Sequence, residues 1–176
     1  VEVKNADADV DTVTLDYAAS ATATFEANSL MVGVLTITDA STVVIENTST
    51  SNAEFDQDGN ATGLTLDATD TTSLTIRATS SGDMITNNIT ATDEITTLNV
   101  SSAATGGAVT VGTIVDVDGL TSFTVNALNE DITIGALGSD ATGGANLNGN
   151  AEELTTISVT ATGTGVTANL GNIFLD

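Results

Sequence analysis

The 176-residue chain carries 24 acidic residues against two basic ones, which gives a formal net charge of −22. Nucleic acids and anionic membrane surfaces both require a basic footprint, so the composition argues against either as a partner. The absence of Cys and His excludes disulfides and thiolate metal sites, and it removes the commonest general base. No apolar run approaches the length of a membrane span, so membrane insertion is not expected.

The composition favours β-structure. Pro is absent and aromatic residues make up 3% of the chain, so a core must be built from Val, Ile, Leu and Ala. Thr is abundant, and Thr with Val and Ile suits a pleated, half-buried surface. The chain starts at Val1 without a signal peptide, so we expect a segment of a longer or processed protein. Residues 1–176 show no composition shift and are predicted to form a single repeat domain.

In chain order, alternating apolar and polar residues predict strands in several places. They occur over residues 1–17, over 25–38 as one or two strands, and over 43–45. A polar interruption at residues 46–62 is predicted to be a loop, and a strand resumes at 63–67. From there each main strand is followed by a short second strand ending in apolar-Thr-apolar-Gly, as at 132–135. Gly at that place suits a tight corner.

The main strands share a repeated phrase, which is clearest in Asp118-Gly-Leu-Thr-Ser-Phe-Thr-Val. The first core apolar residues of the six copies are Val13, Val43, Leu74, Leu98, Phe123 and Ile157, at spacings of 24 to 34 residues. Such a period is typical of solenoids, in which each unit buries its apolar face against its neighbours. Alternation predicts that the apolar pairs point inward; these are Val13/Leu15, Val43/Ile45, Leu74/Ile76, Leu98/Val100, Phe123/Val125 and Ile157/Val159.

The fold class predicted from this pattern is all-β, as a β-solenoid resembling a parallel β-helix with about six irregular coils. The alternative is a β-sandwich, in which paired strands would run antiparallel. Small polar residues flank the apolar pairs, as at Ser122 and Thr124, and are predicted to form outward-facing ladders.

Acidic loops suggest Ca²⁺ as a cofactor, because hard cations prefer several oxygen ligands on flexible loops. The strongest candidate loop has oxygen-bearing residues at alternate positions around a Gly. The predicted metal ligands are Asp56, Asp58 and Asn60 in that loop, Asp7, Asp9 and Asp11 near the start, and Asp116 with Asp118 before a main strand. The competing interpretation is that Asp and Asn here are simply turn residues.

No catalytic site is predicted, because plentiful carboxylates occur without a basic partner or the aromatic platforms usual in sugar sites. Arg77 follows a main strand, and we expect it on the surface near Asp67 or Asp70.

The acidic, Cys-free, Thr- and Gly-rich sequence, with phrases such as Leu-Thr-Thr-Ile-Ser-Val at residues 154–159, resembles bacterial surface-layer proteins and adhesins related to the RTX secreted proteins. The stretch Gly143-Gly-Ala-Asn-Leu-Asn-Gly149 departs from the RTX nonapeptide, so no ligand is taken from that motif. The resemblance implies secretion to the cell surface, Ca²⁺-supported stability and assembly into a lattice or filament.

Two functions follow as expectations. The first is a structural subunit or segment of an extracellular bacterial surface layer or filament, whose partners are copies of itself. The alternative is an adhesin stalk or a module that binds glycan or another surface, with cell-surface polysaccharide as the partner. The five aromatic residues lie scattered along the chain, which does not favour a glycan groove.

Overall fold

The structure is a computed structural model that describes residues 10–27, 32–55, 62–66, 71–90, 94–115, 117–138, 151 and 153–175. The regular secondary structure in these ranges is all β-strand, which confirms the prediction of an all-β chain. The strands are β1 Val10–Ala27, β2 Val32–Asn47, β3 Ala53–Phe55, β4 Thr62–Leu66, β5 Ser73–Ala78, β6 Met84–Thr86, β7 Asn88–Thr90, β8 Thr97–Ser102, β9 Val109–Val111, β10 Ile114–Val115, β11 Ser122–Ala127, β12 Ile132–Ile134, β13 Thr156–Ala161 and β14 Ala168–Leu170. Within the described ranges, no helix has the length and hydropathy that a membrane crossing requires.

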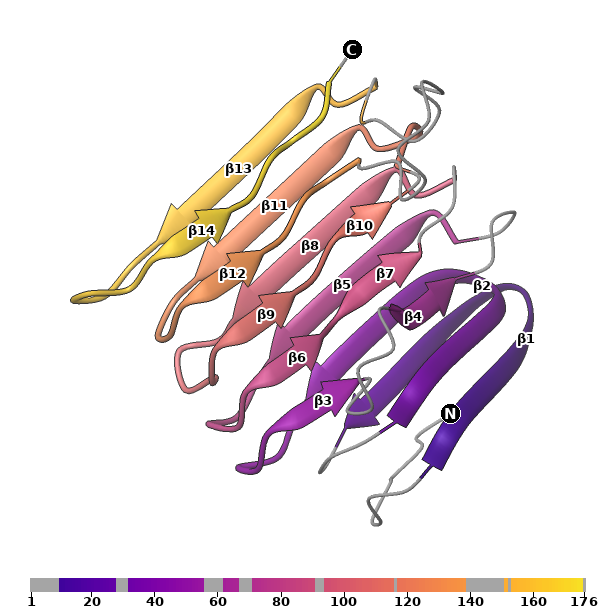
Figure 1. Cartoon of the computed structure of the whole chain (residues 1–176), viewed down its shortest axis with the longest axis horizontal. Helices are drawn as coiled ribbons and strands as arrows, with labels where there is room; N and C mark the ends of the chain where they lie inside the picture. The colour runs from indigo at the N-terminus through magenta and orange to yellow at the C-terminus, as the bar shows by residue number, and fades with distance from the viewer. Residues whose placement is uncertain are drawn as a thin grey trace.

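The repeated phrase forms one ladder of parallel strands in the order β2, β5, β8, β11, β13 (Figure 1). In this first ladder the predicted anchors are direct register partners from Val43 onward. Val43 pairs with Leu74, Leu74 with Leu98, Leu98 with Phe123, and Phe123 with Ile157. The register of the repeat is therefore confirmed over these five copies, although their spacing along the chain varies.

The first predicted copy is wrong. Val13 pairs with Leu35, and the position stacked against Val43 belongs to Ala23. β1 is a single long strand with an irregularity in its middle, and only its second half continues the first ladder. A small residue there keeps the period-two alternation without the large apolar residue that the sequence search required. The burial of the Val13 and Leu15 side chains lies outside the described part of the structure.

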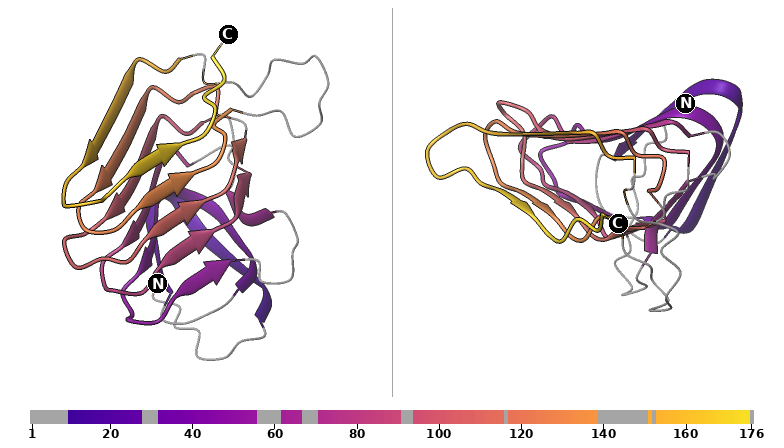
Figure 2. Two further views of the ribbon diagram at one scale, coloured as in Figure 1. Left: turned by 60° about the vertical axis from the view of Figure 1, so that its left-hand side comes forward. Right: turned by 90° about the horizontal axis from the view of Figure 1, so that it is seen from above.

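Two further ladders complete the sheet (Figure 2). The second ladder runs β3, β6, β9, β12, β14. In the third, β4, β7 and β10 pair in turn, and single bridges carry the pairing on to Leu137 and Ile173. Every pair formed by the described strands is parallel. The antiparallel pairs that a β-sandwich would need do not occur among them.

The ladders share one apolar interior. In β5, β8 and β11 buried and half-buried residues alternate strictly, as period two demands. The inward pairs predicted at Val43, Leu74, Leu98 and Phe123 are all buried, and they belong to a single cluster with the second and third ladders. Each such side chain contributes roughly 1.5–3 kcal/mol of hydrophobic stabilisation when fully buried. This interior holds the three ladders together.

β2 turns a corner within its own length. Its first part, at Leu35, pairs with β4, and its later part, at Val43, pairs with β5. Between them Asp39 has φ 61°, the one positive φ among the described non-glycine residues. Asp tolerates this left-handed conformation better than most residues, so the two parts of β2 can pair with strands of different ladders.

Glycines stack where the second ladder ends. Gly112, Gly135 and Gly171 follow register-matched positions of β9, β12 and β14. A Cβ on Gly135 would lie 2.8 Å from the carbonyl carbon of Gly112, and one on Gly171 would lie 2.4 Å from the carbonyl oxygen of Gly135. The backbone of the neighbouring repeat leaves no room for a side chain, so close approach of the chain explains Gly at these positions.

Replacing Gly135 by Ala should therefore destabilise the chain by about 1–3 kcal/mol, the usual cost of overpacking, because backbone rather than a flexible side chain must move. Urea unfolding would measure the loss. The control is Thr133→Ala at an exposed position of the same strand, which should change the unfolding free energy by less than about 0.5 kcal/mol. Equal stability of the two variants would contradict the close approach at the corner.

Candidate interaction surface at the end of the strand stack

The ladders end at β13 and β14. β13 pairs with β11 on one side, β14 pairs with β12, and within the described residues neither has a strand on its other side (Figure 1). Unpaired strand edges offer a row of N–H and C=O groups to another chain. We use the term end surface for β13, β14, Phe174 and Leu175.

The end surface exposes apolar side chains that were predicted to be buried. Ile157 and Val159 keep the inward register, paired with Phe123 and Val125, but they are 48% and 44% exposed. The prediction of their burial is wrong because no described strand covers β13. The same side-chain positions one strand earlier, at Phe123 and Val125, are fully covered.

Exposed apolar side chains collect at this end of the stack. The large exposed apolar residues in the described part of the chain are Leu128, Ile157, Val159, Phe174 and Leu175. The partly buried apolar residues that pack against the core lie here too; they are Leu154, Val166, Ala168, Leu170 and Ile173. The core is thus well covered over most of the stack and incompletely covered at one end.

The end surface is also free of charge. Residues 154–175 contain no Asp, Glu, Lys or Arg, although the whole chain has 24 acidic residues. A second copy that approached these residues would therefore meet no like charge on them. Apolar exposure and lack of charge coincide on the same elements.

Hydroxyl groups connect successive strands just before the first ladder begins. Thr72 Oγ1 donates to the Ser41 carbonyl at 3.1 Å, and Thr96 Oγ1 donates to the Thr72 carbonyl at 3.1 Å. The column continues from Thr121 to Thr96 at 3.0 Å and from Thr155 to Thr121 at 3.1 Å. Each Thr therefore holds the entrance of its strand against the previous one, up to the last strand.

Acidic residues between the strands also form hydrogen bonds with neighbouring repeats. Asp83 Oδ1 accepts the backbone N–H of Ala108 at 2.9 Å, and its Oδ2 accepts Asn52 Nδ2 at 3.1 Å. Asp131 Oδ1 accepts the N–H of Thr167 at 2.7 Å. The carboxylates of these two residues therefore complete hydrogen bonds of the backbone.

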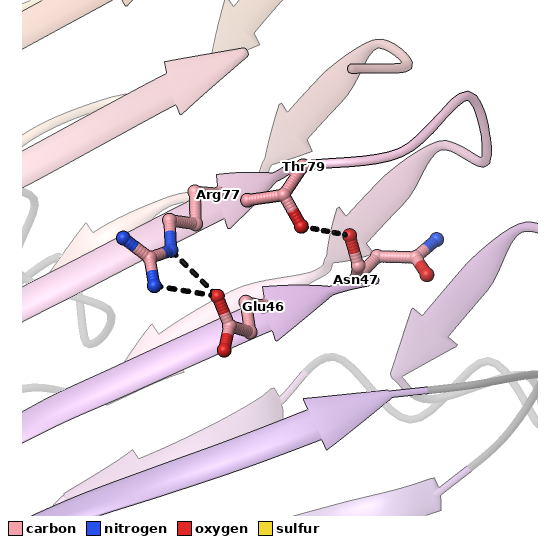
Figure 3. A network of polar contacts seen from close by, with 4 residues as sticks. All are labelled: Glu46, Asn47, Arg77 and Thr79. Carbon is pink, nitrogen blue, oxygen red and sulfur yellow. Dashed lines mark hydrogen bonds and ion pairs between the residues drawn. The ribbon is translucent and has the colours of Figure 1, made fainter. Parts of the chain in front are cut away.

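One ion pair crosses the first ladder (Figure 3). Both Nε and Nη2 of Arg77 lie 2.6 Å from Glu46 Oε2, and Glu46 is 7% exposed. The register places Glu26 on the other side of Glu46, so Arg77 offsets the repulsion between two adjacent carboxylates. The ion pair was not anticipated from the sequence, and the expected neighbours Asp67 and Asp70 lie outside the described residues.

Asn47 is a buried polar residue beside this pair, which the sequence suggested was part of a loop. Its Nδ2 donates to the carbonyls of Ser51 and Asp83, both at 2.8 Å, and its Oδ1 accepts the N–H of Ser49 at 2.9 Å. Its own carbonyl accepts Thr79 Oγ1 at 3.2 Å (Figure 3). Asn47 thus fixes the turn from the first to the second ladder.

The predicted Ca²⁺ ligands fall mostly outside the described residues. This holds for Asp56, Asp58, Asn60, Asp7, Asp9 and Asp116. Asp11 lies in β1, where its side chain is also outside the description, and Asp118 lies in the turn before β11. Asp118 Oδ1 is buried without a hydrogen-bond partner. In the described ranges no three acidic side chains come together as a metal-binding group.

Comparisons with protein-family models, with curated proteins and with solved structures find no match. Any function for the chain is therefore inferred from its residues and their geometry.

Replacing Arg77 by Ala should lower the unfolding free energy by about 1–2 kcal/mol, because it leaves the covered Glu46 carboxylate next to Glu26 without a cation. The double variant Arg77→Ala/Glu46→Gln should recover part of the loss, since it removes the stranded charge. Urea unfolding at low and high NaCl would measure both variants, and the loss should shrink at high salt. A loss that the double variant leaves unchanged would contradict an electrostatic role.

Proposed function

We propose that this chain is a structural segment of an extracellular bacterial surface layer or filament, built as a β-solenoid that associates with copies of itself and is stabilised by Ca²⁺. The observation that carries the proposal is the end surface, where unpaired strand edges coincide with exposed apolar, uncharged side chains. Unpaired strand edges of this kind are places where a further copy can add.

The solenoid is the simplest path for the chain through these ladders. Passing from β5 to β6 to β7 and on to β8, the chain visits the three ladders in turn and returns to the first one strand further along. The route repeats from β8 to β9 to β10 and on to β11. Coils of this kind extend by simple repetition, which suits a protein whose role is to span distance or fill a lattice.

A structural role also fits how the described polar groups are used. Asp83 and Asp131 accept backbone hydrogen bonds, Glu46 bonds to Arg77, and the Thr column bonds strand to strand. Each of these groups joins one coil to another. We therefore propose that the chain is not an enzyme.

The proposed extracellular location rests on the resemblance of the sequence to surface-layer and RTX-related proteins. A net charge of −22 gives a strongly hydrated surface and a strong attraction for divalent counter-ions. Ca²⁺ would reduce repulsion between acidic loops, and at Asp118 it would supply the partner that the buried Oδ1 lacks. Cations bound this way would stabilise both the single chain and its assemblies.

Electron microscopy of the purified protein tests the structural proposal. In the presence of millimolar Ca²⁺ we expect ordered sheets or fibres, and after chelation we expect fewer or shorter ones. Dispersed particles under both conditions would contradict the proposal and favour the rival function, an adhesin stalk or surface-binding module. Pull-down on bacterial cell-surface polysaccharide would then test that rival directly.

Ca²⁺ should raise the melting temperature of the wild-type chain. At a free concentration of about 100 times the dissociation constant the stabilisation is about 2.7 kcal/mol, which corresponds to a rise of roughly 5–10 °C for a chain of this size. Asp58→Ala and Asp118→Ala should each reduce the rise. Differential scanning calorimetry would measure it, with NaCl at matched ionic strength as the control. A rise reproduced in full by NaCl would show plain screening and contradict specific binding.

A further inference from the structure

We infer that Asp118 is a site of spontaneous chemical modification, at which the aspartyl residue converts to isoaspartate through a cyclic imide formed with Gly119. The reaction needs no enzyme and no cofactor, and the inference does not depend on the proposed function. The site is the turn just before β11, where the chain comes back from the third ladder to the first.

The dipeptide Asp118-Gly119 favours this reaction, because glycine has no side chain to hinder its own backbone nitrogen. The nitrogen of Gly119 attacks Cγ of Asp118 and loses its proton, while the carboxyl hydroxyl leaves as water. Water then opens the five-membered imide. Attack on the Cγ carbonyl restores aspartate, whereas attack on the backbone carbonyl of Asp118 leaves the main chain running through Cγ and gives isoaspartate. One water is lost and one is regained, so the chain keeps its mass.

The turn leaves both reacting groups free. Asp118 and Gly119 are its two central residues, and a hydrogen bond from the Leu120 N–H to the Val117 carbonyl closes it at 2.9 Å. The N–H of Gly119 forms no hydrogen bond within the described part of the chain, so closing the imide breaks none there. Oδ1 of Asp118 is buried, and no described group donates a hydrogen bond to it. Nothing of this kind therefore holds that oxygen away from the imide geometry.

Two other aspartates of the described chain lie in turns that restrain them. Asp83 Oδ1 accepts the N–H of Ala108, and the backbone nitrogen that follows, that of Met84, donates to the Ala108 carbonyl at 2.8 Å. Asp131 is held in the same way, because Thr167 bonds both to its carboxylate and to the nitrogen after it. Forming an imide at either residue would break hydrogen bonds between repeats. The turn before β11 lacks both restraints.

Isoaspartate would lengthen the backbone of this turn, because the main chain then includes Cβ and Cγ of the residue. The next residues fix the register of β11, since the N–H groups of Thr121 and Ser122 donate to the Thr96 carbonyl at 3.0 and 3.1 Å. Leu120, which precedes them, is fully buried. A longer turn should displace these groups and loosen the start of β11. Modified chains should therefore unfold at a lower urea concentration than unmodified chains, and equal midpoints would contradict this consequence.

Incubation of the folded chain at physiological temperature and neutral pH tests the reaction. A chelator is present, so that no cation occupies the carboxylate of Asp118. Mass spectrometry with electron-transfer fragmentation distinguishes isoaspartate from aspartate and locates it in the chain. We expect isoaspartate to accumulate at Asp118 at least about tenfold faster than at Asp83 or Asp131, because ordered hydrogen bonds must open first at those two residues. Equal rates at the three positions, or no reaction at Asp118, would overturn the inference.

The same incubation in urea separates the effect of the fold from that of the dipeptide. Because the folded turn leaves both groups free, the rate at Asp118 in the folded chain should lie within about tenfold of the rate in the unfolded chain. A folded-state rate far below that range would show that the fold protects Asp118, and it would overturn the inference.

Two variants test the chemistry. Gly119→Ala should slow the reaction several-fold, because its methyl group hinders the attacking nitrogen, whereas Thr105→Ala, in an exposed turn of the preceding repeat, should leave the rate unchanged. Circular dichroism checks that both variants fold. If Gly119→Ala does not fold, Asp118→Asn replaces it, since ammonia then leaves and each event is seen as a change in mass. A folded Asp118→Asn chain that keeps its amide would overturn the inference, as would equal rates in Gly119→Ala and the wild type.

Discussion

Everything in this structure depends on keeping each strand in the same parallel register as the strand before it. Backbone hydrogen bonds such as Thr97 N–H to the Thr72 carbonyl, at 3.1 Å, and Ser122 N–H to the Thr96 carbonyl, at 3.1 Å, fix that register at the start of each main strand. Once it is fixed, inward residues stack on inward residues and the core follows automatically. The corners and loops can then vary in length, since they need only return the chain to the same starting point. Thr hydroxyls and carboxylates between the strands reinforce this register, because they form hydrogen bonds from one repeat to the next.

The first ladder could be predicted from the sequence. Which strands lie at the two ends of the stack could not. The inward positions of Leu98 and Phe123 could be predicted because the same alternating pattern recurs around both residues. Alternation of apolar and polar residues is the direct consequence of strand geometry. The inward position of Ala23 could not be predicted in this way, because the pattern was identified by large apolar residues and Ala is small. The exposure of Ile157 was also out of reach, because a repeat looks the same whether or not another strand covers it. The third ladder, at Ile114 for example, has too few residues per coil to show a period.

The polar residues between the strands were likewise predictable only in part. The acidic corners could be found by composition, but whether a carboxylate binds a cation or completes a backbone hydrogen bond depends on distances that sequence does not contain. The carboxylates of Asp83 and Asp131 complete backbone hydrogen bonds. Asn47 is the opposite case, a residue typical of loops that is buried because three hydrogen bonds satisfy its side chain. The ion pair of Arg77 with Glu46 likewise depends on strand register, which brings together residues 31 positions apart.

The parallel ladders have a mechanical consequence. Hydrogen bonds between the strands point along the stack, so a force pulling the two ends apart loads each strand boundary in turn instead of shearing many bonds together. Such a stack would yield by peeling its outermost coil first, at low force, and would then lengthen in steps of one coil. Its neighbours would stay folded, because the core contacts of a coil are confined to the coils on either side. A stack of parallel strands of this kind would therefore act as an extensible spacer, which absorbs strain by releasing strands from its end and recovers when they pair again.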